Sequence, residues 1–343
     1  MPDALMPLPD IESTDRTAPP VFLQSGFRSA GTWLWSRFRA MPGILAYCEP
    51  LNEELAVVTA SRIAALTQAA LQLRHPSLSD PYFAEFAPLL NPDGTGVRGF
   101  RAEFGLSTYF ELPPALAAPL TDYLAGLIAH ARRAGRQPVL KFARALGRAG
   151  WLRTAFPAAK QVLVLRDPLE QFLSGLDLAR QYGNRTFLMI PLFAISRRSA
   201  GPLRRVCEVI GVPAIPATED LGACIGAYVA MTESLPMRSL FGAFLAMFIV
   251  SHARSTPFAD LVIDTRPLAG DGRYRSRIEA ALQALSGQPV SLADFATAPR
   301  PDAASAEDAA YREAVEDISA ILAPEYSESV AFVRERLPPR MVA

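Results

Sequence analysis

Short apolar runs alternate with stretches of helical periodicity along most of the chain. Apolar runs predict strands at 21–25, 137–142, 161–165 and 261–264. The third of these is almost continuously apolar, which is typical of a strand buried on both faces. Apolar residues at helical spacing predict helices at 51–73, 116–133, 237–253 and 311–336. Strands that alternate with helices form parallel sheets, so we expect an α/β fold of three layers, α/β/α, around a central parallel sheet.

Two segments break this alternation. Residues 75–114 are rich in Pro, Gly and aromatic residues, which predicts an irregular excursion over one face. Residues 182–217 are also predicted to be irregular, and with the helix at 237–253 they make a second excursion, 182–253, that carries Arg197, Arg198, Arg204 and Arg205. We therefore expect a single domain at 19–343, preceded by a flexible, acidic and proline-rich tail at 1–18.

Bulk composition limits the classes of partner. The 343 residues include 34 Lys and Arg and 34 Asp and Glu, so the formal net charge is zero. No polybasic tail or patch indicates binding to nucleic acid or to an anionic membrane. The longest apolar run, 240–250, is much shorter than the roughly 20 residues that span a bilayer. We therefore expect a buried helix there rather than a membrane span.

Cysteine usage and the N-terminus both favour a cytoplasmic protein. Cys48, Cys207 and Cys224 are widely spaced and form no Cys-x-x-Cys pair, so neither a disulfide framework nor a metal site is predicted. The first 20 residues lack a basic region followed by an apolar run, which a signal peptide would have.

The first predicted strand leads into a loop of the form Gly-x-x-x-x-Gly, from Gly26 to Gly31, and then into a helix. Such a loop points backbone N–H groups at a phosphate. In a loop that binds nucleoside triphosphates, a Lys and then a Ser or Thr follow the second Gly, whereas this chain has Thr32 and Trp33. The loop is therefore predicted to hold phosphate without ATPase chemistry.

The residues inside the loop fit a single bridging phosphate. Arg28 supplies one cation, and the amides of Ser29, Ala30, Gly31 and Thr32, with the Thr32 hydroxyl, supply donors at a helix N-terminus.

A second strand-to-helix junction faces the same way. Arg166 closes the predicted strand 161–165, and Asp167 is a good N-cap for a helix that begins at Pro168. Ser174 lies about two turns into that helix. Because the carboxyl ends of parallel strands share one edge of a sheet, we expect Arg166 and Ser174 to approach the anion held by the first loop.

Both junctions resemble motifs of the sulfotransferase family. Phe27-Arg28-Ser29-Ala30-Gly31-Thr32-Trp33-Leu34 resembles the family's 5′-phosphosulfate loop, Pro-Lys-Ser-Gly-Thr-Thr-Trp. Leu165-Arg166-Asp167-Pro168 with Ser174 downstream resembles its 3′-phosphate motif, Arg-Asp-Pro followed by Ser. The motifs occur in the expected order at comparable separation, and the likeness spans about 21–285.

The resemblance implies a fold related to P-loop NTPases and the donor 3′-phosphoadenosine-5′-phosphosulfate (PAPS), which leaves as 3′-phosphoadenosine-5′-phosphate (PAP). No triphosphate or metal ion is then needed. Arg28 stands where a Lys usually contacts the bridging oxygen, and a guanidinium there acts by charge alone because it does not give up a proton. Trp33 matches a tryptophan that stacks on adenine, and Arg166 and Ser174 match the 3′-phosphate ligands.

Glu49 is the candidate general base of the acceptor. It stands one short connection after the first strand–loop–helix unit, where carbohydrate-modifying members carry a catalytic Glu, and burial in a cleft would raise its pKa. A capping or surface role is the alternative, because Glu53 and Glu54 beside it have the pattern of solvated acids. His130 and His252 are weaker candidates. Lys141, at a strand end on the same edge, is expected either to bind a substrate or to form an ion pair.

We therefore expect transfer of a sulfuryl group to a hydroxyl, or less readily an amine, of a small-molecule, glycan or lipid acceptor. Two alternatives stay open: a small-molecule P-loop kinase, and a catalytically silent nucleotide-binding protein of the same fold. A homodimer is compatible with the sequence.

Overall fold

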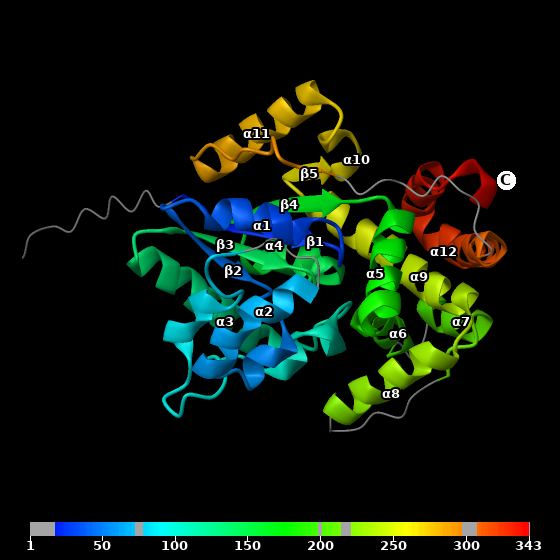
Figure 1. Cartoon of the computed structure of the whole chain (residues 1–343), viewed down its shortest axis with the longest axis horizontal. Coiled ribbons are helices and arrows are strands. Elements are labelled where there is room, and N and C mark those ends of the chain that lie inside the picture. The colour runs from blue at the N-terminus through cyan, green and yellow to red at the C-terminus, as the bar shows by residue number, and fades with distance from the viewer. Residues whose placement is uncertain (1–17, 73–77, 198–200, 214–220, 297–306, 343) are drawn as a thin grey trace, which may run out of the picture.

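The computed structural model describes residues 18–72, 78–197, 201–213, 221–296 and 307–342. Five strands form one parallel sheet in the order β2-β3-β1-β4-β5 (Figure 1). The strands are β1 Val21–Ser25, β2 Ile44–Cys48, β3 Gln137–Phe142, β4 Lys160–Leu165 and β5 Leu261–Asp264. The predicted tail lies outside the described residues except at position 18, as do Arg198 and positions 75–77.

Helices cover both faces of this sheet, which confirms the predicted α/β fold. The α-helices are α1 Gly31–Arg39, α2 Ala60–Gln72, α3 Pro114–Arg133, α4 Ala149–Ala155, α5 Pro168–Tyr182, α6 Thr186–Ser196, α7 Pro202–Val209, α8 Leu221–Ser234, α9 Met237–Ser255, α10 Thr265–Leu268, α11 Gly272–Ser286 and α12 Asp308–Arg336. The step from β1 to β2 runs along the sheet in the opposite direction to the later steps. Right-handed crossovers therefore place α1 on one face and α3, α4 and α9 on the other.

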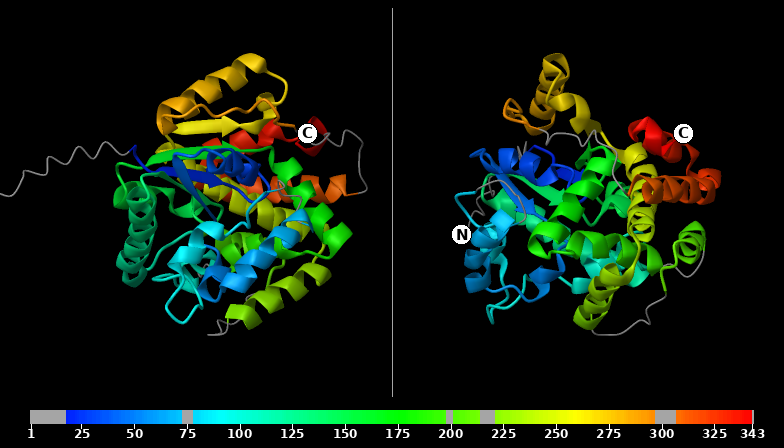
Figure 2. Two further views of the ribbon diagram at one scale, coloured as in Figure 1. Left: turned by 60° about the vertical axis from the view of Figure 1, so that its left-hand side comes forward. Right: turned by 45° about the vertical axis from the view of Figure 1, so that its right-hand side comes forward.

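Two hydrophobic clusters hold these layers together. One joins the sheet to α1, α3 and α11, and the other joins α5–α9 to α12. In Figure 2, α11 lies at the β5 end of the sheet and α12 runs beside α9. The second cluster forms a wall beyond the carboxyl ends of β1 and β4.

Three local predictions were wrong. Residues 186–196 and 202–209 are helical rather than irregular; positions 187–195 of α6 are all buried, so α6 has no polar face and no amphipathic period. The predicted helix 51–73 is split into a 3₁₀ turn at Glu53–Ala56 and α2. The strand β2 was not predicted at all. Residues 78–113 are irregular as expected, with short 3₁₀ turns.

The contact between α9 and α12 contains a partly buried imidazole. The ring of His252 stacks on Phe332 at a centroid distance of 4.1 Å, and its Nδ1 lies 2.9 Å from the Ser329 hydroxyl. Burial, with the nearby positive charge of Arg336 adding to it, lowers the pKa of His252 to about 4.

We expect this histidine to make the fold sensitive to acid. The unfolded chain binds a proton at His252 below about pH 6.5, whereas the folded chain does not until about pH 4, so stability is lost as the pH falls through that window. With an allowance for the partial exposure of the ring, the loss from this group is about 2 kcal/mol. Urea unfolding between pH 7 and pH 4 measures it. A His252→Gln variant should show a flatter slope, and an unchanged slope would contradict the assignment.

Candidate active site at the carboxyl edge of the sheet

The two predicted phosphate-binding junctions meet in the fold. β1 and β4 are neighbours, and their connections leave in opposite directions along the sheet, which defines the switch point where open α/β sheets bind ligands. Arg166 donates from Nη1 to the carbonyl oxygen of Arg28 at 3.0 Å. Arg28 in turn donates from Nε to the Ser174 hydroxyl at 3.2 Å. Three residues singled out from two distant motifs therefore lie in direct contact.

The first loop holds a strained backbone. Arg28 and Ala30 have φ values of 65° and 66°, in the left-handed region that residues with a Cβ seldom occupy. The Ser29 hydroxyl closes the turn by donating to the carbonyl oxygen of Gly26 at 2.6 Å. Ala30 is the N-cap of α1 and has no side chain with which to cap its first amides. This geometry leaves a helix N-terminus directed at the switch point, where an anion is favoured.

The floor of the loop fits an anion. A Cβ on Gly31 would lie 2.0 Å from Ser25 Oγ and 3.1 Å from Lys141 Cε, so only glycine is accommodated here. Within the described residues, the buried Ser25 Oγ has no hydrogen-bond partner. A buried hydroxyl without a partner is costly, and an anion in the loop would supply one. Sequence reasoning missed Ser25, although its place as the polar end of an apolar strand, directly before Gly26, was a usable signal.

Relief of the strain in the loop has a measurable effect. Ala30→Gly is expected to raise the free energy of unfolding by about 0.5–1 kcal/mol, because glycine occupies the left-handed region without a Cβ clash. Thermal or urea unfolding checks this. Gly126→Ala in α3 is a control for the opposite replacement. It should also raise stability, because a Cβ there meets nothing within 4 Å and alanine favours the helix. A loss of stability in Ala30→Gly would show that the backbone is not strained at this position.

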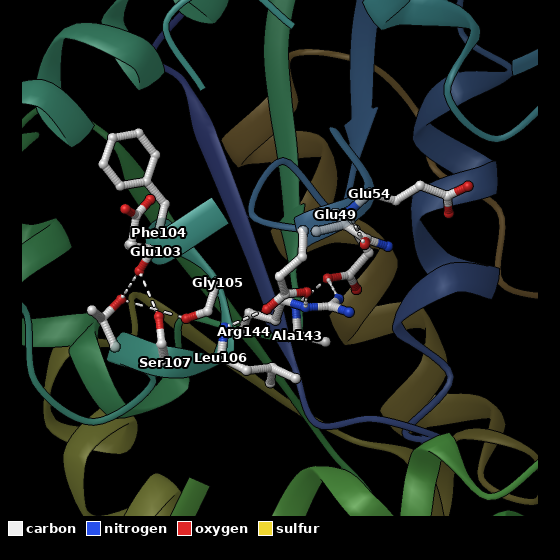
Figure 3. Close-up of polar contacts among 12 residues, drawn as sticks. Glu49, Glu54, Glu103, Phe104, Gly105, Leu106, Ser107, Ala143 and Arg144 are labelled. Carbon is white, nitrogen blue, oxygen red and sulfur yellow. Dashed lines mark hydrogen bonds and ion pairs between the residues drawn. The ribbon is translucent and has the colours of Figure 1, made fainter. Parts of the chain in front are cut away.

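Glu49 follows β2 with a φ of 49°, a third non-glycine residue in the left-handed region at this edge. Its Oε1 pairs with the ammonium of Lys141. Its Oε2 accepts from the backbone amide of Ala143 at 3.1 Å and from Arg144 at 3.2 Å, as Figure 3 shows. Strained backbone of this kind concentrates at functional sites.

These contacts decide the protonation of Glu49. Burial by itself raises the pKa of the carboxyl group, but the charges of Lys141 and Arg144 and the hydrogen bonds outweigh it, so the pKa is lowered. The sequence predicted a rise from burial, and the cations were not foreseen. Glu49 is therefore ionised at neutral pH.

Arg144 joins the site to the irregular segment. Its guanidinium donates to Glu49 and, at 2.9 Å, to Glu53, and it lies 5.4 Å from the centre of the Phe27 ring. The side chain of Glu53 is only 14% exposed, so the predicted solvated role was wrong for this acid. In Figure 3 the segment from Glu103 to Ser107 lies beside Arg144.

These side chains line one pocket of about 290 Å³. Its polar side contains Arg28, Thr32, Glu49, Lys141 and Arg144, and its apolar side contains Phe27, Tyr82, Phe83, Leu178, Phe187 and Ile190. Both predicted catalytic residues, Arg28 and Glu49, are thus on the same pocket. The arrangement combines an anion cradle, a carboxylate and an apolar wall.

Trp33 does not line this pocket. Its ring packs edge-on against Phe295 at a centroid distance of 4.8 Å, and the space beside it is only about 10 Å³. For adenine to stack on Trp33, the Phe295 ring would have to turn aside. The two described histidines are also engaged away from the pocket, since Nδ1 of His130 lies 2.8 Å from the Tyr47 hydroxyl and His252 contacts Ser329.

Metal-binding clusters and membrane-spanning helices are both absent from the described residues. No three His, Cys, Asp or Glu side chains within them gather as a metal site would require. In that same part of the chain, no helix combines the length and apolarity needed to cross a membrane.

Comparison with family models and with curated proteins finds no match. Among solved structures, the chain is similar to a sulfotransferase from Alicyclobacillus acidocaldarius, at 16% identity and a TM-score of 0.38, over 95% of this chain and 100% of that one. It is also similar to the sulfotransferase domain of the olefin synthase from Synechococcus PCC 7002, at 13% identity and a TM-score of 0.32, over 85% and 83%. Both bear the name of the family that the two motifs resemble.

Proposed function

We propose that this chain is a sulfotransferase that moves a sulfuryl group from PAPS to the hydroxyl group of an acceptor. The main support for the proposal is the contact between the loop after β1 and the junction of β4 with α5. Arg28 contacts both Arg166 and Ser174 near the N-terminus of α1, and Thr32 stands where a triphosphate-binding loop has Lys. Two cationic side chains at one helix N-terminus suit a nucleotide that carries two separate phosphate groups.

The residues present fit such a donor. The amides of Ala30, Gly31 and Thr32 and the hydroxyl of Ser25 would hold the 5′-phosphosulfate, and Arg166 and Ser174 would hold the 3′-phosphate. The donor supplies an activated sulfuryl group. Arg28 would stabilise the negative charge that develops on the departing 5′-phosphate, the kind of electrostatic effect that contributes most to many enzymes.

In the proposed reaction the acceptor oxygen attacks sulfur, a new S–O bond forms, and the bond between sulfur and the 5′-phosphate oxygen breaks. The hydroxyl proton passes to Glu49, and PAP leaves. Glu49 is a weak base while Lys141 and Arg144 pair with it. An anion beside Thr32 would compete for the Lys141 ammonium, and any weakening of that pair raises the pKa of Glu49. Donor binding would therefore activate the base.

A transfer assay tests the proposal. The purified protein is incubated with PAPS labelled in the sulfuryl group and with a panel of alcohols, phenols and sugars, and labelled product is measured together with PAP. Equal amounts of product and PAP are expected. Transfer of the γ-phosphate of ATP instead would favour the kinase alternative. Donor binding without transfer to any member of the panel would favour the silent nucleotide-binding alternative.

A further inference from the structure

A second, smaller cavity lies directly behind the apolar side of the active-site pocket. It measures about 40 Å³ and lies among β4, α5, α6 and α9. Phe27, Phe187 and Ile190 line both this cavity and the active-site pocket. These three side chains therefore form the partition between a charged reaction pocket and an inner chamber.

The inner chamber is lined mostly by apolar side chains. Besides the partition it is lined mainly by Leu146, Val164, Leu165, Pro191, Phe244, Met247 and Phe248. Its polar lining groups are engaged with other residues: the Tyr109 hydroxyl lies 3.0 Å from the Ser251 hydroxyl, Gln171 donates to the carbonyl oxygen of Arg166 at 3.0 Å, and Nδ1 of His252 lies 2.9 Å from the Ser329 hydroxyl. A space of this kind stays dry, because a water molecule needs two or more polar partners.

Close packing between α5 and α6 holds Phe187 in the partition. A Cβ on Gly175 of α5 would lie 1.9 Å from the Phe187 ring, so the ring rests on bare helix backbone at this point. Only glycine at position 175 lets α6 approach closely enough to hold Phe187 between the two spaces. The ring also lies 5.6 Å from that of Phe244 across the chamber.

We propose that the acceptor is an alcohol with an apolar chain or ring, whose hydroxyl lies beside Glu49 and Arg28 and whose apolar end enters the inner chamber past Phe187 and Ile190. This rests on the proposed sulfotransferase function and narrows its acceptor class. An apolar end gains affinity from a dry carbon-lined chamber, whereas a sugar ring there would bury hydroxyl groups without partners. The chamber has room for about three water-sized groups, and so for a few methylene groups.

The test is a chain-length series. Primary alcohols from ethanol to decan-1-ol are compared with methyl glucoside as acceptors for labelled PAPS. Each methylene group that enters the chamber should raise kcat/KM by about fourfold, followed by a plateau once the chamber is full. Methyl glucoside should be a poor acceptor.

Two variants should shift this preference in opposite directions. Phe187→Ala opens the partition and should move the optimum to longer or bulkier alcohols, whereas Ile190→Phe narrows it and should remove the gain beyond the shortest members. Phe193→Ala is the matched control: it truncates a fully buried ring on the same helix, α6, that lines neither space. It should lower stability without changing the order of the alcohols.

The outcomes separate this inference from the proposed function. Equal use of the glucoside and all alcohols, with no effect of either variant on their order, would overturn the chamber and leave the transferase intact. The absence of transfer to any acceptor would contradict the proposed function. In that case calorimetric binding of decan-1-ol decides the chamber: binding that Ile190→Phe abolishes supports it, and no binding overturns it.

Discussion

Replacement of Arg28 by Met is expected to slow sulfuryl transfer by about 10²–10³-fold, which is the usual loss when a preorganised group facing developing charge is removed. Arg28 lies in the loop after β1, lines the reaction pocket, and contacts Ser174 of α5. Its charge is needed most as the 5′-phosphate departs. The loss should therefore fall on kcat in the labelled-donor assay, with a smaller loss of PAP affinity.

The Arg28 prediction has two controls. Arg28→Lys should recover part of the rate, because the charge is retained while the guanidinium geometry is lost. Arg37→Met removes an arginine from the last turn of α1 that pairs with Asp294 instead, and it should leave the rate unchanged. Full activity in Arg28→Met would show that this side chain does not face the reacting phosphate.

Replacement of Lys141 by Met is expected to destabilise the fold by about 3 kcal/mol, the lower end of the usual cost of breaking a buried ion pair, because Arg144 still compensates part of the Glu49 charge. Lys141 is 5% exposed, and its ammonium pairs with the carboxylate of Glu49. Urea unfolding at pH 7 measures the loss. The double variant Lys141→Met, Glu49→Gln should regain most of the lost stability, because no uncompensated charge then remains. If the loss of unfolding free energy in the double variant equals the sum of the losses in the two single variants, Lys141 and Glu49 are not coupled.

The ion pair between Glu49 and Lys141 also determines how the stability of the fold changes with pH. Because the pKa of Glu49 is lowered in the fold, its contribution to stability is complete above its ordinary value of 4.5 and is lost as the pH falls through the lowered value. Lys141→Met removes one cause of that lowering, so in urea unfolding the acid-side loss should be smaller than in the wild type and should be complete at a higher pH.

The elements that could be predicted from the sequence are those with a clear local pattern of apolar residues. β1, β3, β4 and β5 were predicted because their apolar runs are bounded by turn residues, and they fix which loops share an edge. β2 is also an apolar run, as long as β1, and it follows Pro42 and Gly43, so its signal was present in the sequence and was missed. α6 is buried all round, so it lacked the period that marks a helix.

The same distinction holds for the site. The contact between the first loop and Arg166 was predictable, because both strand–helix junctions lie at the carboxyl edge of a parallel sheet. The pair of Glu49 and Lys141 joins residues 92 positions apart, and the partition joins Phe27 to α6, so only the fold brings them together. The lowered pKa of Glu49 follows from those distant cations and was predicted with the opposite sign.

The most direct test is calorimetric titration with PAP, beside ATP with magnesium, on the wild type and on Arg166→Ala. We expect PAP to bind tightly, ATP to bind weakly, and the variant to lose PAP affinity by about 100-fold, because Arg166 is assigned a charge-assisted contact with the 3′-phosphate. Binding of ATP in preference to PAP, or PAP affinity that survives in the variant, would contradict the assignment of the two loops to a single bisphosphate nucleotide.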